Sequence, residues 1–132
     1  MSIESQLLAI ASKRLKDAEE IVQTSLVNLG NSIIISAPVD TGALRNSFFS
    51  AIGQPNISAT READVSGGGA IANLKQKALE VNLGDDFYMT NSMPYAARIE
   101  FNAHSEQAPD GMVRINALRW DSIVETEIQR RK

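Results

Sequence analysis

The sequence has 132 residues, of which 43% are hydrophobic and 22% charged, with a formal net charge of −3. This length fits one domain with a modest core, and the acidic balance argues against a protein that binds duplex DNA, which normally carries a basic surplus. The absence of cysteine excludes disulfides and cysteine-based zinc sites, and no apolar run is long enough to span a bilayer. We therefore expect a single domain, residues 1–132, that is made and used in a cytoplasm without contact with a membrane.

The first predicted element is a long helix over about residues 3–36. Ser2 is placed to cap its first turn, Pro38 forces the preceding residue out of helical geometry, and Gly30 is a weak point that could kink or end the helix early. A helix of about 50 Å is longer than a globule of this size needs, so part of it is expected to project or to pack on a neighbouring subunit. Its apolar positions recur at steps of three or four, as in Leu8, Ala11, Leu15, Ala18, Val22, Leu26, Leu29 and Ile33.

A turn over residues 38–45 follows the helix. Asp40 is expected to accept hydrogen bonds from the amides of Gly42 and Ala43, and Leu44 is expected to enter the core. Residues 46–52 then alternate in a way that predicts a strand. Residues 57–61 are predicted to be a second strand or a continuation of the first.

The middle of the chain alternates flexible and periodic segments. Residues 62–69, which include three successive glycines, predict a flexible connection. Residues 70–81 show the spacing of a helix, residues 87–90 that of a strand, and residues 96–101 are compatible with about one helical turn.

The last segment is expected to close the domain. Residues 102–111 predict a loop and residues 112–115 a short strand, after which Asn116 is expected to cap a helix that runs to about residue 130. The cations at 130–132 favour the negative end of this helix over a nucleic-acid patch. The whole order predicts an α+β fold, in which a small, mostly antiparallel sheet is packed by helices and the long helix precedes a body of residues 37–132.

The residues capable of chemistry do not form a recognisable catalytic set. The glycines at 67–69 lack the lysine and hydroxyl spacing of a phosphate loop, and Asp85–Asp86 lie in a turn where aspartate is expected for backbone bonding alone. His104 is the only histidine, with Glu106 and Asp110 as nearby acids, which is a weak signal for a metal. We therefore expect no enzyme activity, no cofactor and no metal.

Three residues in the segment after Pro94 leave alternatives open. Tyr95 suits either a structural corner or an interface, because its ring is apolar and its hydroxyl polar. Arg98 and Glu100 either pair with each other in solvent, which contributes little to stability, or one of them pairs with a residue of a neighbouring subunit.

With these segments in place, the chain resembles the tail-completion or neck proteins of tailed bacteriophages, the group that includes minor tail protein Z-like proteins and related tail components. The resemblance covers residues 37–113 and rests on Ala37-Pro38-Val39-Asp40-Thr41-Gly42-Ala43-Leu44-Arg45, Gly84-Asp85 with Phe87-Tyr88-Met89-Thr90-Asn91, Pro94-Tyr95-Ala96 with Ile99-Glu100, and Ser105, Gln107-Ala108-Pro109 and Gly111-Met112-Val113. The chain departs from the family at Asn102-Ala103-His104, where relatives often carry a glycine. The residues taken as candidate interface and structural positions are Pro38, Asp40, Thr41, Gly42, Leu44, Arg45, Pro94, Tyr95, Arg98, Glu100, Gln107, Pro109, Gly111 and Met112.

The resemblance implies a structural virion protein of the head–tail junction that completes or caps the tail and joins it to the head. Such proteins assemble in the host cytoplasm as rings around the DNA channel, with six- or twelve-fold symmetry as the natural expectation. The implied partners are other copies of the chain and the phage connector or head-closure, tail-terminator or tail-tube proteins, while DNA passes nearby without sequence-specific binding. Residues 53–69 and 102–111 are the expected docking elements, and acidic residues facing the channel would repel DNA.

Two rival functions remain at the level of the sequence. One is a small adaptor module outside any virus that binds a single cellular protein as a dimer. The other is a small hydrolase that uses His104.

Overall fold

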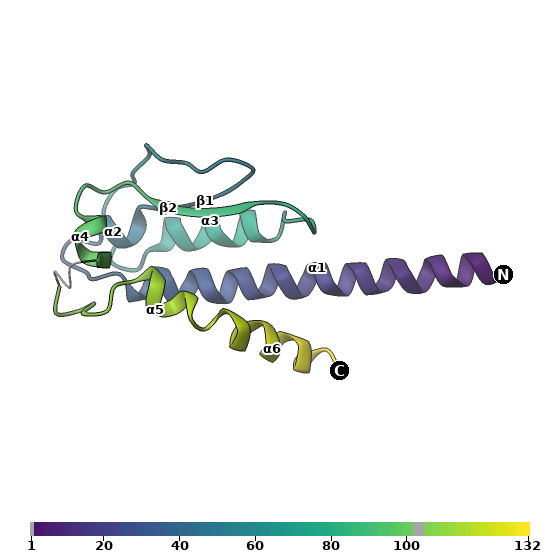
Figure 1. Ribbon diagram of the computed structural model, residues 1–132. Helices are drawn as coiled ribbons and strands as arrows, with labels where there is room; N and C mark the ends of the chain where they lie inside the picture. The colour runs from purple at the N-terminus through teal and green to yellow at the C-terminus, as the bar shows by residue number, and fades with distance from the viewer. Residues whose placement is uncertain (1, 102–104) are drawn as a thin grey trace.

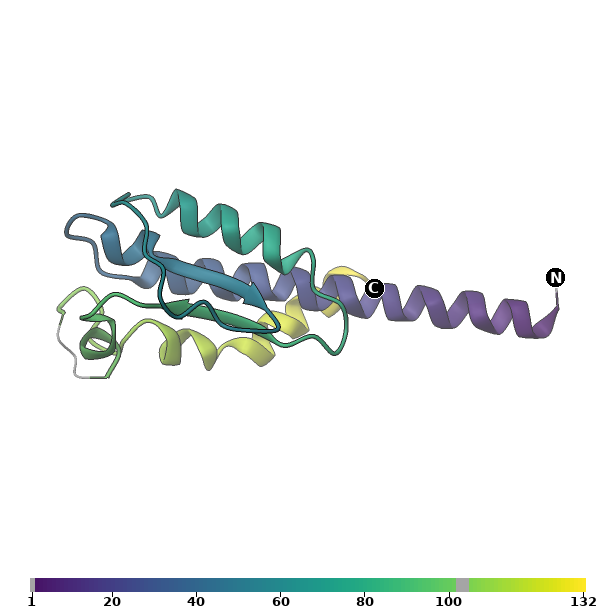
Figure 2. The same ribbon diagram turned by 90° about the horizontal axis from the view of Figure 1, so that it is seen from above.

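The longest element of the computed structural model, which describes residues 2–101 and 105–132, is helix α1 at Ile3–Ser36. Ser2 caps it as predicted, because its side-chain oxygen accepts a hydrogen bond from the amide of Ser5 at 3.1 Å. The helix ends at Ala37, whose extended backbone is the geometry that the following proline requires. The first part of α1, Ile3–Lys16, is exposed on all sides and projects beyond the body (Figures 1 and 2). We call this part the arm.

Helix α1 continues through Gly30, so the predicted kink or early end at this residue is wrong. Gly30 is buried, and helix α3, Gly68–Ala78, crosses over it with the fully buried Leu74. A Cβ atom added to Gly30 would lie 2.6 Å from Leu74 Cδ1. The glycine lowers helix propensity, but it lets two helices pack closely, and tertiary packing outweighs propensity here.

The sheet consists of β1, Phe48–Ile52, and β2, Phe87–Asn91, which pair antiparallel as predicted. Phe48 lies opposite Asn91, and Ile52 lies opposite Phe87. Helices α1 and α3 lie on one side of this sheet, and the connection between β1 and α3 arches over the other side (Figure 1).

The second strand predicted at residues 57–61 is absent, and these residues follow the sheet as a loop. The guanidinium group of Arg61 donates to the backbone oxygens of Asn46 and Phe48 and lies 3.8 Å from the Phe49 ring centroid. The amide of Ser50 donates to Asn73 of α3 at 2.8 Å. Side chains therefore occupy the outer edge of β1, so no free edge remains there for a third strand.

The strand predicted at residues 112–115 is also wrong. The chain instead forms helix α5 at Val113–Ala117, followed by helix α6 at Trp120–Arg130. Asn116 lies inside α5 and caps nothing in α6; its side-chain amide donates to the oxygens of Met112 and Ser36. Helix α4, Ala96–Phe101, forms as predicted, and a short helix α2 at Ala43–Asn46 precedes β1.

The core lies where α1, α3, the sheet and α4 meet. Its fully buried large side chains are Ile34 of α1, Leu74 of α3 and Met112, which precedes α5. Leu44 is buried among them, as predicted from the sequence. The fold is therefore α+β. The second part of the long helix packs against the core, and its first part forms the projecting arm.

Within the described part of the chain, no helix combines the length and the apolar character that a membrane span requires.

The packing of Gly30 against Leu74 predicts that Gly30→Ala destabilises the fold by about 1–3 kcal/mol, because the new methyl group overpacks the crossing. In a Leu74→Ala background the same change should be neutral or should stabilise by up to about 1 kcal/mol, since only helix propensity is then altered. Urea unfolding of the four proteins measures both values. A Gly30→Ala effect of the same sign and size in both backgrounds would show that close packing is not the reason for this glycine.

Candidate functional site

Three of the segments on which the resemblance depends, at residues 37–45, 94–100 and 105–113, meet at one end of the body, opposite the arm (Figure 1). The Gly84-Asp85 segment does not, because the neighbouring Leu83 donates to Glu19 of α1 at 3.3 Å. This end is built from the turn at residues 37–44, helix α4 and the loop at residues 105–112. We call it the loop end.

A side-chain amide joins the two loops of this end. Gln107 accepts a hydrogen bond from the backbone amide of Val39 at 2.9 Å and donates one to the backbone oxygen of the same residue at 3.2 Å. An amide group that satisfies both backbone groups of one residue acts as a short piece of added strand. It fixes the relative position of two segments that lie 68 residues apart.

The carboxylate of Glu100 holds the start of helix α5. It accepts hydrogen bonds from the amides of Met112 at 2.7 Å, Val113 at 2.7 Å and Arg114 at 3.0 Å. The Arg114 guanidinium donates to the same carboxylate at 3.0 Å and to the backbone oxygen of Glu100. It also lies 4.7 Å from the centroid of the Phe101 ring. Glu100 is thus a buried acid whose bonds go to amides left free at a helix start and to one cation.

Two opposing effects set the pKa of Glu100. Burial alone would raise it, because desolvation disfavours the charged form. The hydrogen bonds from Val113, Arg114 and Met112 and from the Arg114 side chain stabilise the charged form and hold the pKa below its ordinary value. Glu100 is therefore ionised at neutral pH.

Glycine is required at two turns of the loop end by both conformation and space. Gly42 and Gly111 have φ angles of 93° and 86°, in the left-handed region. A Cβ on Gly42 would lie 2.4 Å from the backbone of Asp64 and Val65, and one on Gly111 would lie 2.7 Å from the backbone oxygen of Glu100. Both glycines are therefore explained by the folding of this end.

Arg45 closes the C-terminal end of α1. Its guanidinium donates to the backbone oxygens of Ile35 at 2.8 Å and Ala37 at 3.0 Å, and to that of Val65 at 2.9 Å. These bonds satisfy carbonyl groups that a helix end leaves free and place a cation at the negative end of its dipole. The role of Arg45 is thus to join the helix end, the turn and the residue-65 loop.

The turn, Tyr95 and the 105–107 segment enclose a groove of about 640 Å³. Its two ionisable acids, Asp40 and Glu106, are both exposed, and Tyr95 packs against the core from its inner side. Its lining includes seven of the candidate residues, namely Pro38, Asp40, Thr41, Gly42, Leu44, Tyr95 and Gln107.

A second groove, of about 340 Å³, lies between α4 and α5, beside the hydrogen bonds of Glu100 and Arg114. Phe101, Ile115 and Leu118 line it with exposed apolar side chains, and Pro109 and Asp110 lie at its rim. The charges of Glu100 and Arg114 are paired with each other at its base. The character of this groove is therefore apolar with an acidic margin.

Other sequence expectations for this end are corrected by its geometry. Arg98 and Glu100 do not form a solvated pair, since Glu100 pairs with Arg114 within the chain while Arg98 is exposed. The amide of Ala43 donates to Thr41 Oγ1 at 3.2 Å and not to Asp40, because Thr41 is the closer side chain in this turn. Pro94 and Pro109 are exposed and Met112 is buried.

Reasoning from the sequence did not select Arg114, Asn46 or Asn91 as supports of this end. Asn91 donates to the backbone oxygen of Leu44 at 2.8 Å, and Asn46 bonds to the backbone of Glu62 and Ala70. All three act across long sequence separations, which local patterns do not encode. The one available signal was that asparagines at element boundaries commonly bond to backbone groups.

His104, on which the metal hypothesis depends, lies outside the described part of the structure. So do Asn102 and Ala103, where the sequence departs from that of the family it resembles. Among the described residues, no group of three or more histidine, aspartate or glutamate side chains is placed to hold a metal ion.

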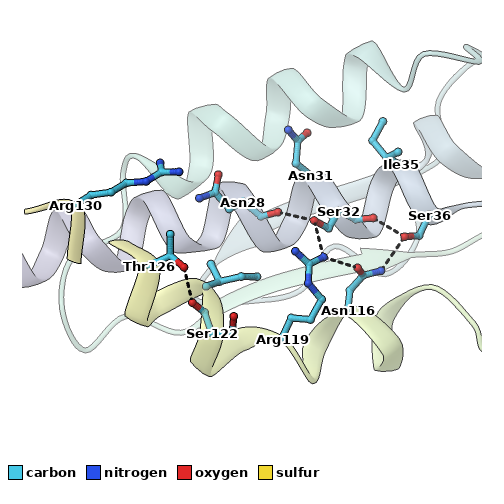
Figure 3. A pocket seen from close by; sticks show the side chains of 11 residues that line it. Asn28, Asn31, Ser32, Ile35, Ser36, Asn116, Arg119, Ser122, Thr126 and Arg130 are labelled. Carbon is cyan, nitrogen blue, oxygen red and sulfur yellow. Dashed lines mark hydrogen bonds between the residues drawn. The ribbon is translucent and has the colours of Figure 1, made fainter. Parts of the chain in front are cut away.

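A further depression of about 650 Å³ lies along the flank, between α1 and the α5–α6 region (Figure 3). Figure 3 shows its small polar side chains joined in a chain of hydrogen bonds: Arg119 donates to Ser32 at 3.3 Å, and Asn116 donates to Ser36 at 2.8 Å. Arg130 lies at one end of the labelled side chains in Figure 3. It pairs with the buried Glu127, and the two charged groups are 3.3 Å apart. Asn28 of α1 also donates to Glu127 of α6 at 3.1 Å, so polar contacts fasten α6 to α1 along this depression, while the buried side-chain oxygen of Asn31 has no partner among the described residues.

No protein-family model, curated protein or solved structure matches this chain in the comparisons made with each.

The bonds of Glu100 predict a pH dependence of stability. Its pKa is lowered in the folded state, so its contribution is fully present above the unfolded value, near 4.5, and is lost as the pH falls through the folded value. We expect Glu100→Gln to destabilise the fold by about 2–4 kcal/mol at pH 7 and by much less at pH 3. Urea unfolding from pH 3 to 7 measures this, with Glu106→Gln, an exposed neighbour, as the matched control. A Glu100→Gln penalty that is the same at both pH values would contradict the assignment.

The Gln107 contact predicts a local effect on exchange. Gln107→Ala removes the acceptor of the Val39 amide, so hydrogen exchange at this amide should accelerate by up to about tenfold, the equivalent of about 1 kcal/mol. Amides of α3 should keep their rates. Unchanged exchange at Val39 would show that the amide contact does not hold the two loops together in solution.

Proposed function

We propose that this chain is a structural protein of the head–tail junction of a tailed bacteriophage. In this proposal each copy is one subunit of a ring around the DNA channel, and the ring completes or caps the tail and joins it to the head. The subunit assembles in the host cytoplasm and remains in the virion. Its partners are other copies of itself and a connector, head-closure, tail-terminator or tail-tube protein.

The observation that carries the proposal is that three of the resembling segments, at residues 37–45, 94–100 and 105–113, meet at one end of the molecule. Gln107 bonds to the turn at Val39, Glu100 bonds to the start of α5, and Tyr95 lies between them. Segments that served only the core of an unrelated fold would have no reason to share one end of the molecule. Their convergence is what a docking end built by a family pattern requires.

The shape and charge of the subunit also favour assembly. The arm offers apolar side chains that nothing in the described subunit covers, which is typical of a surface used between proteins. The net charge of −3 and the exposed acids of the loop end suit a subunit near DNA that does not bind it, because like charges repel.

The proposal predicts a specific assembly defect. Deletion of the coding sequence from a phage or prophage genome that carries it should give DNA-filled heads and separate tails, because neither half can be joined without the ring. Electron microscopy of the lysate and a plaque count measure the outcome, and expression of the wild-type chain in trans should restore joined particles. Normal numbers of joined, infectious particles without the chain would overturn the proposal.

A further inference from the structure

Two apolar surfaces lie at opposite ends of the subunit, and neither has a partner within the described chain (Figure 1). The first is the arm, where Ile3, Leu7, Leu8, Ile10 and Leu15 are each more than half exposed. The second is the α4–α5 patch, which we define as Phe101, Val113, Ile115 and Leu118. Leu118 is 82% exposed and Phe101 63%. Exposed large side chains that gather in two places call for a physical explanation.

The apolar side chains of the arm share one face. At about 100° per residue they fall within about 160° of the helix circumference. Glu4 and Arg14 lie within the same sector, while Lys13 and Lys16 lie on the other side. The same face continues along α1 into Leu29 and Ile33, which pack into the subunit's own core. The body therefore covers the second part of this face and leaves the first part for something else to cover.

The α4–α5 patch has the form of a receiving surface. Its groove of about 340 Å³ lies between Phe101, Ile115 and Leu118. Helix α5 is held rigidly beneath it by Glu100 and Arg114, so the groove is formed before any partner arrives. A preformed groove reduces the ordering cost of binding.

The charges beside the two surfaces are opposite. The arm carries three cations, Lys13, Arg14 and Lys16, and one acid, Glu4. The two loops of the loop end, residues 38–44 and 105–111, carry three acids and no lysine or arginine. The helices of the patch carry two exposed cations, Arg98 and Arg114, and Arg114 is paired with Glu100. These acids are Asp40, Glu106 and Asp110, and all are exposed.

We propose that the arm of one copy docks on the α4–α5 patch of the next copy. The two surfaces cannot meet within one subunit because they lie at its opposite ends (Figures 1 and 2). Between copies they form a head-to-tail contact, which closes into a ring when the rotation between neighbours permits. Pairing of arm with arm would instead leave the patch uncovered.

The areas are consistent with a contact that is weak singly and stable in a closed ring. The exposed apolar side chains of the two surfaces amount to roughly 1,000 Å² together, near the lower limit for a specific interface. Each copy in a ring makes this contact twice, once through its arm and once through its patch. The inference rests on the proposed function only in taking the assembly to be a ring of identical copies.

A mixing experiment tests the direction of the contact. The arm variant carries Leu7→Asp and Leu8→Asp, and the patch variant carries Ile115→Asp and Leu118→Asp. All four side chains are exposed, so both variants should keep the circular dichroism spectrum of the wild type. Leu79→Asp, exposed elsewhere on the body, is the matched control.

Native mass spectrometry and sedimentation should find the wild type and the control as multi-copy species and each variant alone as a monomer. An equal mixture of the two variants should give a dimer with one copy of each, because one intact arm and one intact patch remain. A patch variant that still assembles alone, or a mixture that stays monomeric while the wild type assembles, would overturn the inference. A wild-type chain that is monomeric at about 0.5 mM, where even a weak contact populates dimers, would overturn it too.

A charge exchange separates direct contact from general stickiness. Lys13→Glu with Arg14→Glu, or Glu106→Lys with Asp110→Lys, should each weaken association by at least about tenfold, and mixing the two variants should recover most of the loss. The absence of recovery would argue against these neighbours. Joining of heads to tails in the deletion experiment depends on no particular interface, so failure of this contact and failure of the proposed function give different results.

Discussion

The buried carboxylate of Glu100 is the interaction on which the loop end depends. Four donors from residues 112–114 converge on it, and three of them are backbone amides. A buried charge is costly unless hydrogen bonds replace its lost hydration, and here the free amides at the start of α5 supply them. The same bonds set where α5 begins, and α5 sets where α6 turns back along α1. The groove between α4 and α5 therefore rests on one ionised side chain.

Much of the fold could be predicted from local sequence, because periodicity and turn residues report local geometry directly. The bounds of α1, the pairing of β1 with β2 and helix α4 follow from such patterns. The errors at residues 57–61 and 112–115 have a different origin. In each case a side chain from elsewhere decided the outcome: Arg61 fills the edge of β1, and Glu100 supplies the bonds that start a helix. Short apolar segments carry no signal that separates strand from helix without such tertiary contacts.

The candidate residues were a mixture of two kinds that sequence alone could not separate. Four of them explain how the loop end folds. Gly42 and Gly111 permit the conformations of two turns, Arg45 binds the end of α1, and Met112 packs in the core. Asp40, Tyr95 and Pro109 instead line the grooves that this folding creates. Gln107 and Gly42 belong to both kinds, because each supports the fold of this end and also lines a groove. The structure separates the two kinds by burial and by the partners of each side chain.

The two parts of α1 differ in how far the body covers them, and this difference gives the molecule two distinct ends. From Asp17 onward the helix is increasingly covered by its own body, with Gly30 admitting α3 and the Glu127 contact to Asn28 holding α6. Before that point the same apolar face continues without cover. A helix that needed only to stabilise the body would end where the body ends, because exposed apolar side chains gain nothing from water. The arm therefore leaves an apolar surface that the described chain does not cover, and in the proposed head-to-tail contact the direction from arm to loop end would let identical copies follow one another around an axis.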